Sequence, residues 1–175
     1  MNNKKKSIIA YFSRKGYNYV KGNIIDLKVG NTEIVANKIQ KLTGSDIFRI
    51  DTVKSYPTDY TETTKVAQRE LHENARPELT DSIDNMEQYD IIVLGYPNWW
   101  GTMPMAVHNF LESYSFAGKT IIPFCTHEGS GMGHSIDDIK RLCPDTDVQN
   151  GTPIRGSQAK DADREVQKII KLMEE

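Results

Sequence analysis

The sequence predicts a doubly wound α/β domain, because short apolar segments alternate with segments of helical periodicity along most of the chain. The 175 residues, with 38% hydrophobic and 26% charged side chains, are enough for one domain with a sizeable core. No internal repeat, low-complexity tract or linker interrupts the pattern. We therefore expect a single domain over residues 1–175.

Five apolar, β-prone segments are the strand candidates: 7–12, 46–50, 91–95, 119–125 and a weaker one within 147–154. The continuous apolar run at 91–95 is typical of a strand that is covered on both faces. Helices are expected at 31–42, 59–75, 105–114, 135–142 and 159–173. In the first of these, Val35 and Ile39 have helical spacing and Gly44 follows as a stop signal.

Strands that alternate with helices pair in parallel and are joined by right-handed crossovers. By analogy with other doubly wound proteins, five strands predict a sheet of order 2-1-3-4-5 with helices on both faces, which is a three-layer sandwich. Ligands of such sheets lie beyond the carboxyl ends of the strands, where the strand order reverses. The loops after 7–12, 91–95 and 119–125 are therefore the candidate site.

The first of these loops begins at Ser13 and ends in Gly30-Asn31-Thr32, at the predicted start of a helix. Hydroxyl and amide groups there, together with the free N–H groups of the helix N-terminus, are suited to phosphate. Asn and Thr are also ordinary helix-capping residues, so this loop alone leaves both interpretations open. The segment 14–30 is long for such a connection, and Lys21-Gly22-Asn23 predicts a hairpin-like insertion. This insertion either covers a bound phosphate or only forms part of the edge of the candidate site.

The second loop carries both tryptophans of the chain, in the run Tyr96-Pro97-Asn98-Trp99-Trp100-Gly101-Thr102-Met103-Pro104. An indole offers a flat apolar face to a ring system, and adjacent residues of an extended loop point in different directions. We therefore expect at least one of the two indoles to face a ligand. The alternative is that both anchor the loop or a subunit contact.

The third loop, Thr126-His127-Glu128-Gly129-Ser130-Gly131-Met132-Gly133-His134, is rich in glycine and polar side chains. Its backbone N–H groups can approach the oxygen and nitrogen atoms of a ring, because glycine permits close contact. His127 and Glu128 are candidates to hydrogen-bond a ligand or to tune its charge. A flexible connector is the alternative for this loop.

These three loops together resemble those of the flavodoxin family. Tyr11-Phe12-Ser13 and Gly30-Asn31-Thr32 resemble its phosphate loop, split by the insertion, and the other two loops resemble the flavin-facing loops of a bacterial flavodoxin-like subfamily. The resemblance implies a noncovalently bound flavin mononucleotide (FMN). It implies phosphate contacts from Ser13, Asn31 and Thr32. It also implies ribityl and ring contacts from Pro97, Asn98, Trp99, Trp100, Gly101, Thr126, His127, Glu128, Gly129, Ser130 and Gly131.

Other occupants of similar folds lack their motifs in this chain. Neither GxGxxG nor a Walker A motif follows the first strand, GxSxG is absent, and the strand ends lack the acidic residues of a phosphorelay receiver. The four histidines show no metal-ligand spacing, so no metal site is predicted. A net charge of −2 predicts no nucleic-acid binding, and no apolar run is long enough for a membrane span.

Two functions then stand side by side, both cytoplasmic. The first is an electron-transport flavoprotein that exchanges electrons with redox partner proteins. The second is an FMN-dependent oxidoreductase that uses NAD(P)H to reduce a quinone or a similar small acceptor. The charge of −2 is far from the strongly acidic surface of the carrier flavodoxins that the chain resembles, so a carrier role does not follow automatically. A flavin-free binding module is the third alternative, and the sequence leaves the oligomeric state open.

Overall fold

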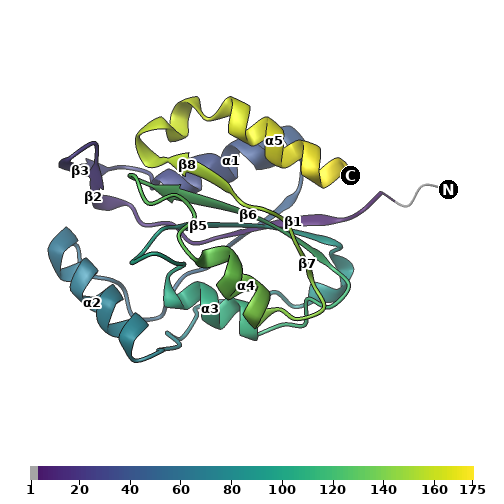
Figure 1. Cartoon of the computed structure of the whole chain (residues 1–175), viewed down its shortest axis with the longest axis horizontal. Helices are drawn as coiled ribbons and strands as arrows, with labels where there is room; N and C mark the ends of the chain where they lie inside the picture. The colour runs from purple at the N-terminus through teal and green to yellow at the C-terminus, as the bar shows by residue number, and fades with distance from the viewer. Residues whose placement is uncertain (1–3) are drawn as a thin grey trace.

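The computed structural model describes residues 4–175, which form a parallel sheet between two layers of helices (Figure 1). The predicted domain span of 1–175 includes residues 1–3, which lie outside the described residues. The strands of the large sheet are β4 Asp46–Arg49, β1 Ser7–Tyr11, β5 Ile91–Pro97, β6 Thr120–His127, β7 Asp147–Val148 and β8 Thr152–Arg155. The helices are α1 Asn31–Thr43, α2 Tyr60–His72, α3 Met105–Glu112, α4 Ser135–Leu142 and α5 Asp163–Glu174.

The sheet order is β4-β1-β5-β6, and β7 and β8 both pair with the far edge of β6. Each of these pairs is parallel. This is the predicted order 2-1-3-4-5, so the fold class is confirmed. The order reverses between β1 and β5, which places the switch point at the carboxyl ends of these two strands.

Two apolar clusters hold the layers together. On one face, α1 and α5 pack on the sheet through residues such as Val35, Ile39 and Val166. On the other face, α3 and α4 pack through Phe110, Leu111 and Ile139. Figure 1 shows α2 beside α3, at the end of the sheet where the strands terminate. The strands between these layers are buried on both faces, as their continuous apolar sequence predicts.

The chain between β1 and α1 forms a separate two-stranded antiparallel sheet. Its strands are β2 Gly16–Val20 and β3 Asn23–Leu27, joined through Lys21 and Gly22. Both turn residues have positive φ values, 50° and 84°, which tight hairpin turns require. This hairpin projects from the end of the molecule that also carries the C-terminal ends of the parallel strands (Figure 1).

Several predicted boundaries differ from the structure: β5 and β6 continue to Pro97 and His127, and α2 and α3 end earlier, at His72 and Glu112. The C-terminal part of the fold differs most. The weak strand expected within 147–154 is split into β7 and β8, and between them the Cα of Gly151 packs so closely on Met132 that a Cβ would lie 2.1 Å from its Cε. The last helix begins with a 3-10 segment, Gly156–Asp161, and becomes α-helical only at Asp163. Within residues 4–175, every helix is too short or too polar to span a lipid bilayer.

Candidate functional site

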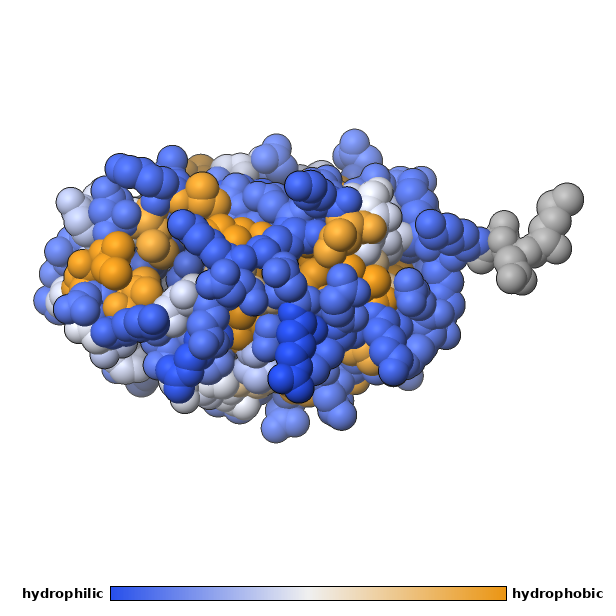
Figure 2. Space-filling view, turned by 90° about the horizontal axis from the view of Figure 1, so that it is seen from above, coloured by the Kyte–Doolittle hydropathy of each residue, from blue (hydrophilic) through white to orange (hydrophobic). Residues whose placement is uncertain are grey.

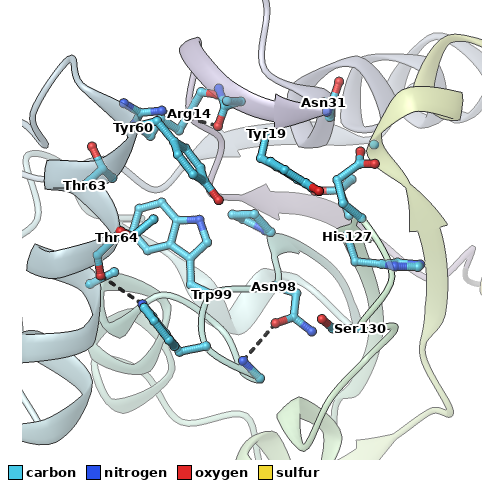
Figure 3. A pocket seen from close by; sticks show the side chains of 18 residues that line it. Arg14, Tyr19, Asn31, Tyr60, Thr63, Thr64, Asn98, Trp99, His127 and Ser130 are labelled. Atoms are coloured by element: carbon cyan, nitrogen blue, oxygen red, sulfur yellow. Dashed lines mark hydrogen bonds between the residues drawn. The ribbon is translucent and has the colours of Figure 1, made fainter. Parts of the chain in front are cut away.

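A cavity of about 480 Å³ lies at the carboxyl ends of the central strands, between the β2–β3 hairpin, α2 and the loops after β5 and β6 (Figure 3). This is the position at which doubly wound sheets bind ligands. Its lining combines aromatic rings with amides, hydroxyls and few charges. The lining residues are Arg14, Asn18, Tyr19, Asn31, Tyr60, Thr63, Thr64, Ala67, Pro97, Asn98, Trp99, Trp100, Gly101, Thr126, His127, Glu128, Ser130 and Gly156.

Ten of the fourteen site residues expected from the sequence line this cavity, and they come from all three expected loops. These ten are Asn31, Pro97, Asn98, Trp99, Trp100, Gly101, Thr126, His127, Glu128 and Ser130. Of the other four, Ser13, Gly129 and Gly131 lie in these loops and Thr32 lies in the first turn of α1, and none of them is on the cavity wall. The structure therefore brings together segments that are up to about a hundred residues apart in sequence.

The two tryptophans occupy a tight turn and point to different surroundings. Trp99 and Thr102 exchange backbone hydrogen bonds, and Trp100 and Gly101 between them have φ values of 56° and 86°. A non-glycine residue in this left-handed region is strained by roughly 1–2 kcal/mol. Trp99 packs edge-on against Phe12 at 5.2 Å, whereas Trp100 is 49% exposed. The indole Nε1 of Trp100 donates to the Thr64 carbonyl, which ties this turn to α2.

Asn98 joins the second and third loops. Its backbone N–H donates to the Thr126 carbonyl at 2.8 Å, and its Nδ2 donates to the Gly131 carbonyl at 2.9 Å. Its Oδ1 accepts from the backbone N–H of Gly101 at 2.9 Å, as Figure 3 shows. One side chain thus fixes both walls of the cavity relative to each other.

An aromatic pair spans the mouth of the cavity. The rings of Tyr19, from the hairpin, and Tyr60, from α2, are stacked with centroids 6.3 Å apart and planes at 25°. Trp99 lies below Tyr60 in Figure 3. Stacked and edge-on aromatic faces of this kind suit a flat, electron-poor ring system.

Arg14 fixes the base of the hairpin. Its guanidinium donates to the carbonyls of Pro57 and Thr58, both at 2.9 Å, and to the Asn18 amide oxygen at 3.3 Å. Burial is the main cause that lowers the pKa of Arg14 from its usual value, and Tyr60 and Asp59 oppose this. This cation lines the cavity, but its donors are committed to holding the hairpin beside the start of α2.

The other end of the cavity lies at the N-terminus of α1. Asn31 lines it there, in the first helical turn, where backbone N–H groups lack intrahelical acceptors. Ser13 Oγ accepts from the backbone N–H of Glu33 at 3.1 Å, so it caps this helix. The hydroxyls of Thr32 and Thr126 share a hydrogen bond of 2.8 Å behind the wall. Of the three residues expected to contact phosphate, Ser13, Asn31 and Thr32, only Asn31 lines the cavity.

Glu128 and His127 complete this side of the cavity. The Glu128 carboxylate accepts from the backbone N–H of Ser157 at 3.0 Å and from that of Lys21 at 3.2 Å, which links the hairpin turn to the segment after β8. His127 Nδ1 accepts from the backbone N–H of Gly129 at 2.9 Å, so its proton lies on Nε2. Burial and then Arg155 lower the pKa of His127 from its usual value, and the Glu128 carboxylate opposes this.

Sequence reasoning missed the contribution of α2 and of the β8–α5 segment. Tyr60, Thr63, Thr64 and Ala67 lie at the start of α2, and Gly156 follows β8. The helical spacing of the first four places them on one face, which is a usable signal, but nothing local says that this face borders a ligand cavity.

Comparison with solved structures supports the fold independently. A protein from Bacteroides eggerthii DSM 20697, assigned as a flavoprotein, is 25% identical, with a TM-score of 0.75 over 97% of this chain and 98% of that one. A second such protein, from Bacteroides uniformis ATCC 8492, is 24% identical, with a TM-score of 0.73 over 95% and 98%. A flavoprotein from Lactobacillus acidophilus NCFM, solved in complex with FMN, is 21% identical, with a TM-score of 0.63 over 90% and 97%.

A search of curated protein sequences gave no significant match. The family model described as flavodoxin matches residues 24–170, which include the second and third loops and all the parallel strands except β1. This match and the strand order agree with the resemblance found in the three loops. The chain belongs to the flavodoxin family.

Proposed function

We propose that this chain binds one FMN noncovalently in the cavity at the carboxyl ends of β1, β5 and β6, and that it transfers electrons through it. The observation that carries the proposal is the convergence of three loops on one cavity, which is aromatic at the hairpin and α2 end and polar at the N-terminus of α1. That polarity matches a ligand with a flat ring at one end and a phosphate at the other.

The phosphate is assigned to the α1 end of the cavity. Asn31 offers its side-chain amide, and the first turn of α1 offers backbone N–H groups at the positive end of the helix dipole. Ser13 Oγ uses only its acceptor capacity in the bond to Glu33, so its proton is free for a phosphate oxygen. Thr32 supports this site through Thr126 rather than through its own contact.

The ring is assigned to the aromatic end, among Tyr19, Tyr60 and Trp99, with the loops at 97–101 and 126–131 along its polar edge. Bound FMN supplies one- and two-electron redox chemistry. The chain sets its potential through stacking, hydrogen bonds and nearby charge. His127 is suited to donate from Nε2, because its Nδ1 already accepts from Gly129, while Glu128 places a negative charge at the same wall.

The direct test is uptake of the cofactor. The chain is purified, stripped of any flavin and titrated with FMN, and the absorption spectrum and flavin fluorescence are recorded. We expect a yellow one-to-one complex with altered flavin absorption bands. A chain that stays colourless at saturating FMN would overturn the proposal.

The electron carrier is favoured over the NAD(P)H-dependent reductase because the chain belongs to the flavodoxin family. The reductase remains the second candidate, because a net charge of −2 is far from the strongly acidic surface of carrier flavodoxins. Mixing the FMN complex with NADH or NADPH decides between them. Slow bleaching and two separated one-electron potentials support the carrier; rapid bleaching without any partner protein supports the reductase.

A further inference from the structure

The β2–β3 hairpin concentrates exposed apolar side chains beside the cavity. Among residues 4–175, eight large hydrophobic side chains are exposed, and five of them lie in this segment. These five are Tyr17, Tyr19, Ile24, Ile25 and Val29. Figure 2 shows hydrophobic residues gathered at the end of the molecule where Figure 1 places the hairpin. We call these five side chains the hairpin patch.

The strand register explains why the hairpin patch is not buried. Tyr19 pairs with Ile24 and Asn18 pairs with Ile25, so successive pairs turn apolar side chains to opposite faces of the ribbon. The ribbon stands away from the main sheet, so neither of its faces is covered in the way the large sheet is. Exposed apolar groups gathered in this way mark interaction surfaces more often than scattered ones do.

The same segment is basic in an otherwise acidic chain. Residues 14–30 contain Arg14, Lys15, Lys21 and Lys28 against Asp26 alone, a local net charge of +3. The whole chain carries −2, so the remainder carries −5. Lys15, Lys21 and Lys28 are exposed, and Lys28 makes a weak ion pair of 3.5 Å with Asp26. A rim of like charges around an apolar centre selects a partner of opposite charge.

We propose that the face of the hairpin patch that carries Tyr17, Tyr19 and Ile24 is the docking surface for a small acidic electron-carrier protein, which exchanges electrons with the site beside it. The inference rests on the proposed FMN function, because Tyr19 belongs both to the hairpin patch and to the cavity wall. A partner seated here therefore lies next to the aromatic end of the site. One electron leaves the reduced partner and one reaches the flavin, with no bond formed or broken.

The charges disfavour the other occupants of this surface. A twofold dimer formed through the hairpin would bring the lysines of two copies together, which is repulsive. An anionic lipid surface satisfies the charge, but it does not place an electron donor or acceptor beside Tyr19. The protein partner is the occupant that accounts for charge, apolar centre and position at once.

The test uses charge reversal with a matched control. The variant Lys15→Glu/Lys21→Glu/Lys28→Glu changes the hairpin, and Lys41→Glu/Lys168→Glu/Lys171→Glu makes the same change in net charge at α1 and α5. The three control lysines are exposed and lie on the helices α1 and α5, whose C-terminal halves are remote from the hairpin in Figure 1. Neither set includes a side chain that lines the cavity.

Two readouts separate docking from flavin binding. The first is the rate at which a reduced, strongly acidic [2Fe–2S] ferredoxin transfers an electron to the FMN complex, measured at several ionic strengths by stopped flow. We expect the hairpin variant to slow this reaction about tenfold at low salt, and the control variant to change it much less. The same hairpin variant should speed electron transfer to cytochrome c, a basic haem protein.

The second readout needs no flavin. Amide chemical shifts of the chain are followed while oxidised ferredoxin is added, and the perturbed residues should lie within 15–29. If FMN does not bind but these shifts appear, the proposed function fails and the docking surface stands. Equal rates and shifts for the two variants, or shifts confined to another surface, would overturn the proposal. Two further results would also overturn the proposal. They are salt-sensitive binding to phosphatidylserine vesicles, or dimerisation, that the hairpin variant loses while its electron transfer from ferredoxin is unchanged.

Discussion

Tyr19 and Tyr60 stack across the mouth of the cavity, with ring centroids 6.3 Å apart, although they belong to different elements 41 positions apart in sequence. Arg14, at the base of the hairpin, also joins these two elements, because it donates to the carbonyls of Pro57 and Thr58 just before α2. The hairpin is therefore a wall of the site as well as an insertion in a loop. This relationship leads to the first prediction.

Replacing Tyr19 by Leu should weaken FMN and riboflavin equally, by about tenfold, because one stacking face is worth roughly 1–3 kcal/mol. Tyr19→Phe keeps the aromatic face and should bind both ligands as the original chain does. Fluorescence titration of each variant measures the two dissociation constants. A Tyr19→Leu variant with unchanged affinity would show that the hairpin does not contact the ring.

Asn31→Asp should separate phosphate from ring binding. A negative charge in the first turn stabilises α1 by about 0.3–1 kcal/mol through the helix dipole, so the variant should fold at least as well. The same charge repels a phosphate within a few ångströms, and we expect FMN affinity to fall about tenfold or more. Riboflavin, which has no phosphate, should be unaffected. Equal losses for FMN and riboflavin would contradict the assignment of the phosphate to this helix.

Gly133→Ala should disrupt the contact between the second and third loops. A Cβ there would lie 2.0 Å from the carbonyl oxygen of Gly101, and because the clashing atoms belong to the backbone, no side-chain rotation can relieve the clash. Gly131→Ala is the matched control, because Gly131 has a similar φ of 62° but open space around the Cβ position. We expect Gly133→Ala to lower the free energy of unfolding by roughly 1–3 kcal/mol more than the control does. If urea unfolding shows the same loss of unfolding free energy for both variants, backbone strain alone would account for the effect and the contact with Gly101 would not.

The buried His108 should make stability depend on pH. Its side chain is almost fully buried on α3, with Nδ1 near the Pro104 carbonyl at 3.3 Å and Nε2 3.9 Å from Asp138. Burial lowers its pKa below 6.5; the Pro104 carbonyl and Asp138 oppose this, while Arg76 and Arg141 add to it. As the pH falls, His108 is protonated in the unfolded chain before it is protonated in the folded chain. The free energy of unfolding that is present above about pH 6.5 is therefore lost as the pH falls through that value.

Urea unfolding of the flavin-free chain at pH 7.5 and at pH 5.5 measures this loss. His108→Gln should show a smaller loss between the two pH values than the original chain. His127→Gln is the comparison variant, because burial also lowers the pKa of His127 but that side chain is only partly covered. If His108→Gln keeps the whole pH dependence, then His108 is not its source.

Much of the fold could be predicted because its signals are local. Apolar runs such as 91–95 and the helix stop at Gly44 identify elements from a few neighbouring residues. The strand order came from analogy, and the break between β7 and β8 contains Gly151, whose Cα packs closely on Met132. No local pattern in the sequence encodes a contact of that kind.

The candidate site could be predicted to the extent that loops at one sheet edge must meet. What the sequence could not give is the direction of each side chain. Trp100 turns outward to Thr64 because its backbone is left-handed, and Thr32 turns inward to Thr126. The aromatic contribution of α2, through Tyr60, depends on where that helix lies relative to the hairpin.

Amide chemical-shift mapping during an FMN titration tests the central claim most directly, because it reports stoichiometry and location together. The account predicts saturation at one FMN per chain. It also predicts large shifts at Asn31, in the loops 97–101 and 126–131, and around Tyr19 and Tyr60, which flank the proposed ring position. No saturable shifts, or shifts confined to residues outside the cavity, would contradict it.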